Sequence, residues 1–309
     1  IKLFLFFFIY VFVFFVFCDK IIPVILENFN LLGEFLMSNV LGIISEYNPF
    51  HNGHLHHLNE SKKMSHSDYS IAIMTGNFTQ RGEPSIVDKW SKTKMAIESG
   101  IDLVIELPTV YSISSAENFA TGAIKILDSL GIVDYLSFGS ECNDISILTD
   151  VADVLYNEPA EYKTLLAHEL SKGESFPKAR EKALMMYLND VRRFANVLSS
   201  PNNILGIEYL KALKRQKSNI TPITVKREGS SHKDNLISRS SKIASATAIR
   251  NLCLSNDFSL LENVLPDSSY TILTESIKMG NFVKNLSAFD KELQGVKDMA
   301  EIFNNKINF

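Results

Sequence analysis

The sequence predicts an α/β fold in which a parallel sheet carries helices on its faces and a mostly helical region follows. Three short apolar runs, Val40–Ser45, Tyr69–Met74 and Ile101–Leu107, have the length and composition of buried strands. Helical spacing follows each run, and Gly100 and Gly131 stand where two of those helices would end. Buried strands that alternate with helices are typical of parallel βαβ units.

The other expected elements follow from the same patterns. In the first half we expect helices over His54–Met64, Val87–Ser99 and Ser115–Leu130, and a fourth strand over Tyr135–Phe138. From Ile145 to Leu213 the strand signal disappears, and the expected helices are Ile145–Tyr156, Tyr162–Lys172, Pro177–Leu198 and Asn203–Lys217. A strand is then expected over Ile223–Lys226, helices over Ala246–Leu254 and Phe258–Val264, and weak helical patterning over Lys278–Phe309.

The composition limits the classes of function. The 309 residues carry a formal net charge of −4, which excludes nucleic-acid binding by bulk positive charge but not by a local basic patch. Cys18, Cys142 and Cys253 are too far apart for a CxxC metal knuckle and too few for a disulfide scaffold.

Residues 1–36 differ from the rest of the chain. An unbroken apolar run extends from Leu3 to Cys18, somewhat shorter than the roughly 20 residues that span a membrane. No small-residue cleavage site follows it, and the first methionine is Met37. We therefore expect the working protein to begin at Met37, and a membrane anchor in residues 1–36 is the alternative. The expected divisions are a hydrophobic leader over 1–36, an α/β core over 37–144, a helical region returning to the core over 145–265, and a partial C-terminal helical region over 266–309.

Histidines are concentrated directly after the first expected strand. The segment His51-Asn52-Gly53-His54 opens the first expected helix. In an open α/β sheet, ligands bind at the carboxyl ends of the strands, where helix N-termini offer N–H groups and a partial positive charge to phosphate. Gly53 would let the backbone approach a phosphate closely. His51 and His54 would donate to oxygens that gain charge during phosphoryl chemistry.

Two other interpretations of the histidines remain open. His54 and His57 lie three residues apart on one helix face, as two metal ligands would, but an HExxH pattern and nearby cysteines are lacking. Alternatively, they are ordinary surface histidines. An HxGH sequence alone is modest evidence, whereas HxGH after the first strand of a βαβ protein favours the phosphate site.

The HNGH segment in this position resembles the HxGH signature of the adenylyl-transferring Rossmann-like superfamily, which includes class I aminoacyl-tRNA synthetases and nucleotidyltransferases. Within it, the chain resembles the bacterial tRNA(Met) cytidine acetate ligase family. The matching segments are GIISEYNPFHNGHLHHL, MTGNFTQRGEPSIVDKWSKTKMAIESGIDLVIELP, SAENFATGAI, FGSE, SPNNILGIEYLKAL and ITVKREG. The resemblance covers roughly Met37 to Leu265. Residues 1–36 have no counterpart in the family, and the family continues further than Lys278–Phe309 at the C-terminus.

The resemblance implies a Rossmann-like parallel sheet of the HxGH nucleotidyltransferase type and an ATP-dependent ligase. Family members activate acetate as acetyl-adenylate, release pyrophosphate and transfer the acetyl group to N4 of the wobble cytidine of elongator tRNA(Met). It therefore implies ATP with accompanying Mg²⁺, acetate and elongator tRNA(Met) as partners, no protein partner, and a cytoplasmic location without membrane contact unless residues 1–36 are an anchor.

The resemblance also assigns site residues. His51 and His54 would be catalytic and would stabilise charge at the phosphates. No residue is expected to hold a metal ion. The residues expected to bind ATP are Ile44, Ser45, Glu46, Tyr47, Asn48, Pro49, Phe50, His51, Asn52, Gly53, His54, Leu55, His56, His57, Gly139, Asn202 and Arg227. Without ATP, Gly139 would be an ordinary turn, and Asn202 would belong to a helix start that Asn203 caps.

Some further residues have two interpretations each. The segment ASATAIR resembles the second phosphate-binding signature of the superfamily through Ser245, Thr247 and Arg250, although the same residues would cap a helix without ATP. Lys89 and Lys92 would meet the pyrophosphate or lie on a solvated helix face.

The sequence says less about tRNA contacts. Basic clusters at Arg192–Arg193, Lys211–Lys217 and Arg239–Lys242 would contact phosphates or be solvated surface, and no RNA-recognition motif is present. Two other functions stay open: an adenylyltransferase acting on a small phosphate substrate, and a non-catalytic tRNA-binding remnant. The segments TGNFTQRGEP and SPNNILG favour the ligase over the first of these.

Overall fold

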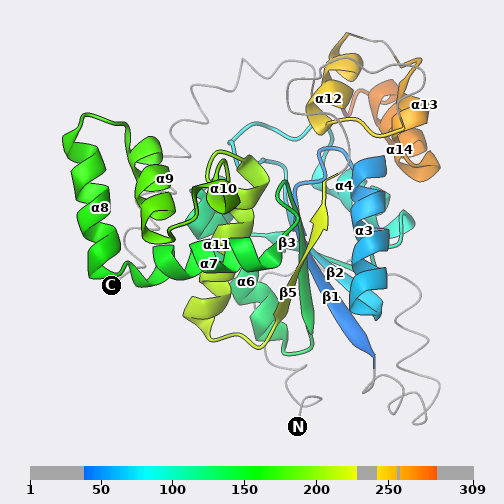
Figure 1. The fold of residues 1–309 in the computed structure, drawn as a ribbon. Helices are drawn as coiled ribbons and strands as arrows, with labels where there is room; N and C mark the ends of the chain where they lie inside the picture. The colour runs from blue at the N-terminus through cyan, green and yellow to red at the C-terminus, as the bar shows by residue number, and fades with distance from the viewer. Residues whose placement is uncertain (1–37, 228–241, 256–257, 284–309) are drawn as a thin grey trace.

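The computed structural model describes residues 38–227, 242–255 and 258–283, and five strands in them form one parallel sheet (Figure 1). The order across the sheet is β3-β2-β1-β4-β5, and each neighbouring pair is parallel. The α/β class expected from the alternating pattern is therefore confirmed. The strands are β1 (Asn39–Ser45), β2 (Ser67–Thr75), β3 (Leu103–Leu107), β4 (Tyr135–Ser140) and β5 (Thr221–Lys226).

Helices cover both faces of the sheet (Figure 1). One face carries α3 (Asn52–Ser65) and α4 (Lys89–Glu98). The helices α12 (Ala246–Leu254), α13 (Leu261–Val264) and α14 (Asp267–Lys278) join the same apolar cluster, with α14 packed against α4. The other face carries α6 (Ala116–Leu130), α7 (Ile145–Asn157) and α11 (Pro201–Gln216). Within β1, Leu41 and Ile43 pack in the apolar cluster on the side of α3 and α4, and Val40 packs in the cluster on the side of α6, α7 and α11. Both faces of this strand are thus buried, which accounts for its continuous apolar run.

The remaining helices lie outside these two layers. The short α5 (Thr109–Ser112) follows β3. Two longer helices, α8 (Ala160–Ser171) and α9 (Phe176–Tyr187), pack against each other as a hairpin beside the sheet (Figure 1), and α10 (Val191–Phe194) follows.

Most of the expected elements are confirmed, and the differences have local causes. The single helix expected over Pro177–Leu198 is wrong, because Asn189 adopts a φ of +52° and the chain divides there into α9 and α10. The helix expected over Phe258–Val264 is restricted to α13. The expected cap Asn203 is also wrong, since Ser200 holds the N-cap position of α11.

Several expectations fall on residues outside the described ranges. These are the leader over 1–36, the residues from 284 onward in the C-terminal region, and residues 239–241 of the third basic cluster. Within the ranges that are described, no helix has both the length and the apolar composition needed to cross a membrane.

The strand order creates a switch point between β1 and β4. From β1 the chain continues to β2 and β3 on one side, whereas β4 and β5 extend the sheet on the other. In open α/β sheets, ligands bind in the crevice beyond the carboxyl ends of the two strands that flank such a point. The segments that begin at Glu46 and Glu141, directly after these two strands, are therefore the ones that the fold offers to a ligand.

Candidate functional site

Two histidines form the N-terminal cap of α3, immediately after β1. The imidazole Nδ1 of His51 accepts a hydrogen bond from the backbone N–H of Gly53 at 3.0 Å. In return, the backbone N–H of His51 donates to Nδ1 of His54 at 3.3 Å. The two rings stack with their centroids 3.7 Å apart. This reciprocal arrangement satisfies backbone donors that a helix start otherwise leaves open.

The cap fixes the protonation of both histidines. Because each Nδ1 accepts a hydrogen bond, the single proton of each neutral ring lies on Nε2. Burial lowers the pKa of His51 to about 3, with the charges of Arg227 and Arg250 adding to the effect. Burial also lowers the pKa of His54 well below its usual value. At neutral pH the site therefore presents two neutral Nε2–H donors.

The absence of a side chain at Gly53 makes this cap possible. A Cβ atom at this position would lie 2.9 Å from Cε1 and 3.0 Å from Nδ1 of His51. At such distances the His51 ring would have to shift. Gly53 thus leaves room for the ring that caps the helix, whether or not a phosphate also approaches its backbone.

Arg250 is held beside the turn that connects β1 to α3. Its guanidinium donates to the carbonyl oxygen of Asn48 at 3.0 Å and to Oγ1 of Thr247 at 3.1 Å. Ser245 caps α12 by accepting from the backbone N–H of Ala248 at 3.1 Å. The cradle expected from Ser245, Thr247 and Arg250 thus has its cation at the His51 turn, while Ser245 performs the cap role that was the alternative.

Arg227 approaches the same histidines from β5. Its backbone N–H donates to the carbonyl oxygen of Ser140 at the end of β4. A Cβ atom on Gly139 would lie 3.1 Å from Cγ of Arg227, so the arginine stem lies against the open side of that glycine. The positive charge of Arg227 contributes to the lowered pKa of His51 and of His54. Gly139 therefore makes room for a cation that acts on the histidine pair.

A second cluster joins the end of β4 to the start of α11. The Glu141 carboxylate accepts from the side-chain amide of Asn202 at 2.6 Å and from the backbone N–H of Asn203 at 2.9 Å. In the opposite direction, Oδ1 of Asn203 accepts from the backbone N–H groups of Glu141 and Cys142. Asn203 is almost fully buried. The expected ligand Asn202 is thus fixed by Glu141, a residue to which the sequence had assigned no role.

The other residues of the expected ATP segment divide between the site and the core. Leu55 packs in the apolar cluster beneath α3. The Nε2 atom of His57 lies 3.1 Å from Oγ of Ser137 on β4, and Oγ of Ser137 lies 2.6 Å from Oγ of Ser61. The side chain of His57 therefore anchors α3 to the sheet. The structure describes no group of three histidine, cysteine or carboxylate side chains that is arranged to hold a metal ion.

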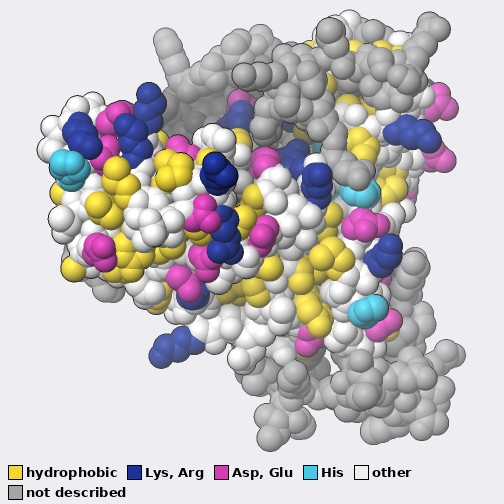
Figure 2. Space-filling view, viewed as in Figure 1, with side chains coloured by type: hydrophobic (Ala, Val, Ile, Leu, Met, Phe, Trp, Pro, Cys, Tyr) yellow, Lys and Arg dark blue, Asp and Glu magenta, His cyan; other side chains and the backbone are white. Residues whose placement is uncertain are grey.

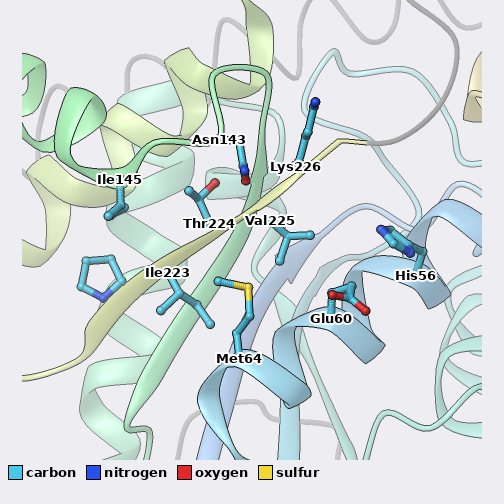
Figure 3. A pocket seen from close by; sticks show the side chains of 10 residues that line it. His56, Glu60, Met64, Asn143, Ile145, Ile223, Thr224, Val225 and Lys226 are labelled. Carbon is cyan, nitrogen blue, oxygen red and sulfur yellow. The ribbon is translucent and has the colours of Figure 1, made fainter.

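His56 lines a cavity of about 400 Å³ that does not include His51 or His54 among its lining residues (Figure 3). His56, Glu60 and Met64 of α3 form one side of the cavity, and the outer edge of β5 forms the other. Pro222 occupies one of the outward-facing positions of this edge strand and supplies no N–H donor there, which discourages pairing with a further strand.

Both interpretations of Lys92, as a pyrophosphate contact and as part of a solvated helix face, are wrong. Its side chain is fully buried rather than solvated. The ammonium donates to the carbonyl oxygens of Thr75 and Gly76, each at 2.9 Å, and to the hydroxyl of Ser85 at 3.1 Å. It therefore holds the start and end of the loop between β2 and α4 together. That loop in turn donates from the Gln80 backbone N–H to Glu46 at 2.7 Å, beside the histidine pair.

Acidic side chains pair with three of the four cations in the Lys211–Lys217 cluster. On α11, Lys211 pairs with Glu208, Lys214 with Asp153 and Arg215 with Glu117. Lys214 and Arg215 lie in the last turn of α11, whereas Asn202 lies in its first turn. Basic and acidic side chains also intermingle on the α8–α9 hairpin (Figure 2). The cations of α11 and of the α8–α9 hairpin are thus largely paired with carboxylates.

An HNGH segment at the switch point of a parallel sheet is the arrangement of the HIGH nucleotidyl transferase class. Residues 38–306 match the family model described as HIGH Nucleotidyl Transferase. The chain belongs to the tRNA(Met) cytidine acetate ligase family, because it is 47% identical over 277 residues to the tRNA(Met) cytidine acetate ligase of Caldanaerobacter subterraneus subsp. tengcongensis. That alignment covers 86% of this chain and 68% of the relative.

Solved structures show the same relationship. The crystal structure of Thermotoga maritima TmcAL bound with alpha-thio ATP is 42% identical to this chain, with a TM-score of 0.72 over 79% of this chain. The apo form of that protein is 43% identical, with a TM-score of 0.75 over 79% of this chain. The chain spans 57% and 58%, respectively, of the length of these two solved chains.

Proposed function

We propose that this chain activates acetate with ATP and transfers the acetyl group to N4 of the wobble cytidine of elongator tRNA(Met). The observation that carries the proposal is the pair of neutral Nε2–H donors on His51 and His54, fixed at a helix N-terminus beside Arg250. The family to which the chain belongs supplies the reaction. The ATP analogue bound to the solved relative supports ATP as the nucleotide.

The reaction consists of two displacements. A carboxylate oxygen of acetate attacks the α-phosphorus of ATP, and the bond from that phosphorus to pyrophosphate breaks. The cytidine amine then attacks the acetyl carbonyl carbon, the bond from that carbon to the AMP oxygen breaks, and the amine loses a proton. Neither step requires a covalent bond to the protein, so the protein acts by positioning the reactants and stabilising charge.

The two histidines suit the first displacement. Negative charge increases on the phosphoryl oxygens as the carboxylate approaches. Neutral Nε2–H groups donate hydrogen bonds to such oxygens without having to lose a proton, and the nearby charges of Arg227 and Arg250 favour the same negative charge. We propose the same ATP-binding residues as the family resemblance does, with Leu55 and His57 acting from beneath the site rather than at its surface.

Other features of the proposal concern the surroundings of this reaction. The described residues offer no cage of carboxylates for Mg²⁺, so we propose that Mg²⁺ arrives bound to the ATP phosphates. We further propose that the sheet with β5 and α12 forms the adenylating unit, that tRNA is the macromolecular partner with no further protein required, and that the reaction takes place in the cytoplasm.

Acetate-dependent exchange of pyrophosphate into ATP tests the first step. The full chain should exchange label between pyrophosphate and ATP only when acetate is present, and tRNA should not be required. Exchange that needs no acetate, or that needs a phosphorylated substrate instead, would identify a different adenylyltransferase. Binding of tRNA without any exchange would identify a non-catalytic tRNA-binding protein.

A further inference from the structure

We propose that Glu141 is a positioning residue that turns the side-chain amide of Asn202 so that its oxygen, rather than its nitrogen, faces the nucleoside of ATP. This proposal rests on the proposed function. It concerns the cluster at the end of β4 and the start of α11, where the Glu141 carboxylate and the Asn202 amide are in direct contact.

The orientation of the amide follows from the chemistry of its partner. An ionised carboxylate can only accept hydrogen bonds, so the amide nitrogen of Asn202 must face it. The nitrogen lies 2.6 Å from Oε1 of Glu141, and the backbone N–H of Asn202 approaches the same oxygen at 3.3 Å. The amide oxygen is consequently directed away from Glu141. It can accept a hydrogen bond from a ligand, but it cannot donate one.

The Glu141 carboxylate also determines which end of ATP can lie at the N-terminus of α11. The N-terminus of α11 would otherwise attract a phosphate, because its N–H groups and helix dipole favour negative charge. Glu141 already satisfies this terminus by accepting from the backbone N–H of Asn203 at 2.9 Å. A second negative group beside it would be repelled, whereas the cations Arg227 and Arg250 lie near His51. The nucleoside therefore belongs at Asn202 and the phosphates at the histidine pair.

Two groups of adenosine can donate to the oxygen of Asn202. One is the 6-amino group of adenine, and the other is a ribose hydroxyl. Both are hydrogen-bond donors, so the structure assigns a donor-selecting role to the Glu141–Asn202 pair. Inosine triphosphate replaces the amino group with an acceptor, and 2′-deoxy or 3′-deoxy ATP lacks one hydroxyl. These analogues distinguish the two sources of the donor.

The variant Glu141→Gln tests this role. Its neutral amide keeps an oxygen that can accept from the start of α11, but it no longer requires the nitrogen of Asn202 to face it. We expect wild-type chain to bind one of the analogues about tenfold more weakly than ATP, the effect of one lost hydrogen bond. Glu141→Gln should weaken ATP binding by a similar factor. The variant should then bind ATP and that analogue with nearly equal affinity, so that the affinity ratio falls close to one.

A matched control separates positioning from capping. Asp144 is another carboxylate at this edge of the sheet, where it caps α7 by accepting from the backbone N–H of Ser146. Asp144→Asn should lower thermal stability without changing the ratio of the affinities for ATP and the analogue. If Glu141 only caps α11, Glu141→Gln will weaken the binding of every nucleotide equally, which overturns the proposal. Equal affinity of the wild-type chain for ATP and all three analogues also overturns it.

These binding measurements do not depend on acetate chemistry. A chain that binds ATP with the expected ratio but shows no acetate-dependent exchange would refute the proposed function and leave the role of Glu141 supported. If the chain exchanges pyrophosphate in the presence of acetate but Glu141→Gln leaves the affinity ratio unchanged, the proposed function is supported and the role of Glu141 is refuted. A chain that binds no ATP would overturn both.

Discussion

The imidazole rings of His51 and His54 stack at 3.7 Å, and the backbone N–H of His51 donates to Nδ1 of His54. Because Nδ1 of His51 is itself an acceptor from Gly53, both rings carry their proton on Nε2. The pair thus closes the N-terminus of α3 and leaves a neutral Nε2–H on each ring, next to the carboxyl end of β1.

Substitutions of His54 should distinguish the role of its Nε2 atom from that of its Nδ1 atom. A glutamine amide nitrogen reaches roughly the position of Nε2, whereas an asparagine amide reaches only that of Nδ1. We therefore expect His54→Gln to retain more acetate-dependent exchange than His54→Asn. His54→Ala should lose about 10²–10³ in rate, the typical effect of removing one donor to a developing charge. His168→Ala, at an exposed position on α8, is the control and should be unaffected. Equal loss in His54→Gln and His54→Asn would refute the Nε2–H assignment.

Stability should decrease in weak acid because of the buried histidines. Burial lowers the pKa of His51 to about 3 and that of His57 to about 4, whereas an unfolded histidine titrates near 6.5. Between about pH 4 and 6.5 the unfolded chain binds more protons than the folded one, so the free energy of unfolding falls as the pH falls. Each histidine contributes a slope of up to about 1.4 kcal/mol per pH unit.

Denaturant titrations at several pH values measure this slope. His57→Gln should make it shallower by about one proton, whereas His168→Ala should leave it unchanged. A slope that is the same in wild-type chain and His57→Gln would show that His57 is protonated in the folded protein.

Gly53→Ala should impair activity more than stability. The added methyl group would press on the His51 ring, so the cap would be displaced, at a loss of about 1 kcal/mol. Alanine regains about as much through its better helix propensity. We expect nearly unchanged thermal stability together with much reduced exchange. Asn59→Ala, an exposed position on the same helix, is the control. Full activity in Gly53→Ala would show that the position of the His51 ring does not matter.

Lys92→Met should destabilise the loop between β2 and α4. The variant leaves the carbonyl oxygens of Thr75 and Gly76 without their donor, which costs about 3 kcal/mol. Burial lowers the pKa of Lys92 to about 7, compared with about 10.5 in an unfolded chain. Between these values the unfolded chain binds more protons, so the stability of the wild-type chain should rise with pH relative to the variant. Parallel denaturation curves at pH 7 and 10 check this, and a constant difference would contradict the lowered pKa.

The strands and the position of the HNGH segment could be predicted because their signals are local. An apolar run such as Val40–Ser45 is buried on both faces in any parallel sheet, and a helix that follows it begins at the site edge. The break at Asn189 could not be predicted, because no proline or glycine marks it. The apolar spacing alone favoured one continuous helix there.

The contacts that orient the site depend on residues far apart in the sequence. Glu141 and Asn202 are separated by 61 positions, and their contact exists only because the end of β4 meets the start of α11. The burial of Lys92 was equally hidden, since a lysine is almost always exposed and its acceptors here are two backbone carbonyls and two hydroxyls rather than a carboxylate. The FGSE segment contained the relevant glutamate, but only the glycine in it had been assigned a role.

The transfer of an oxygen atom from acetate to AMP tests the central claim most directly. The full chain would be incubated with ATP, tRNA(Met) and acetate labelled with ¹⁸O in both oxygens, and the AMP would be analysed by mass spectrometry. If the carboxylate attacks the α-phosphorus and the cytidine amine then attacks the carbonyl carbon, each AMP released with an acetylated cytidine should contain one ¹⁸O. Acetylated tRNA accompanied by unlabelled AMP, or by ADP, would contradict the account.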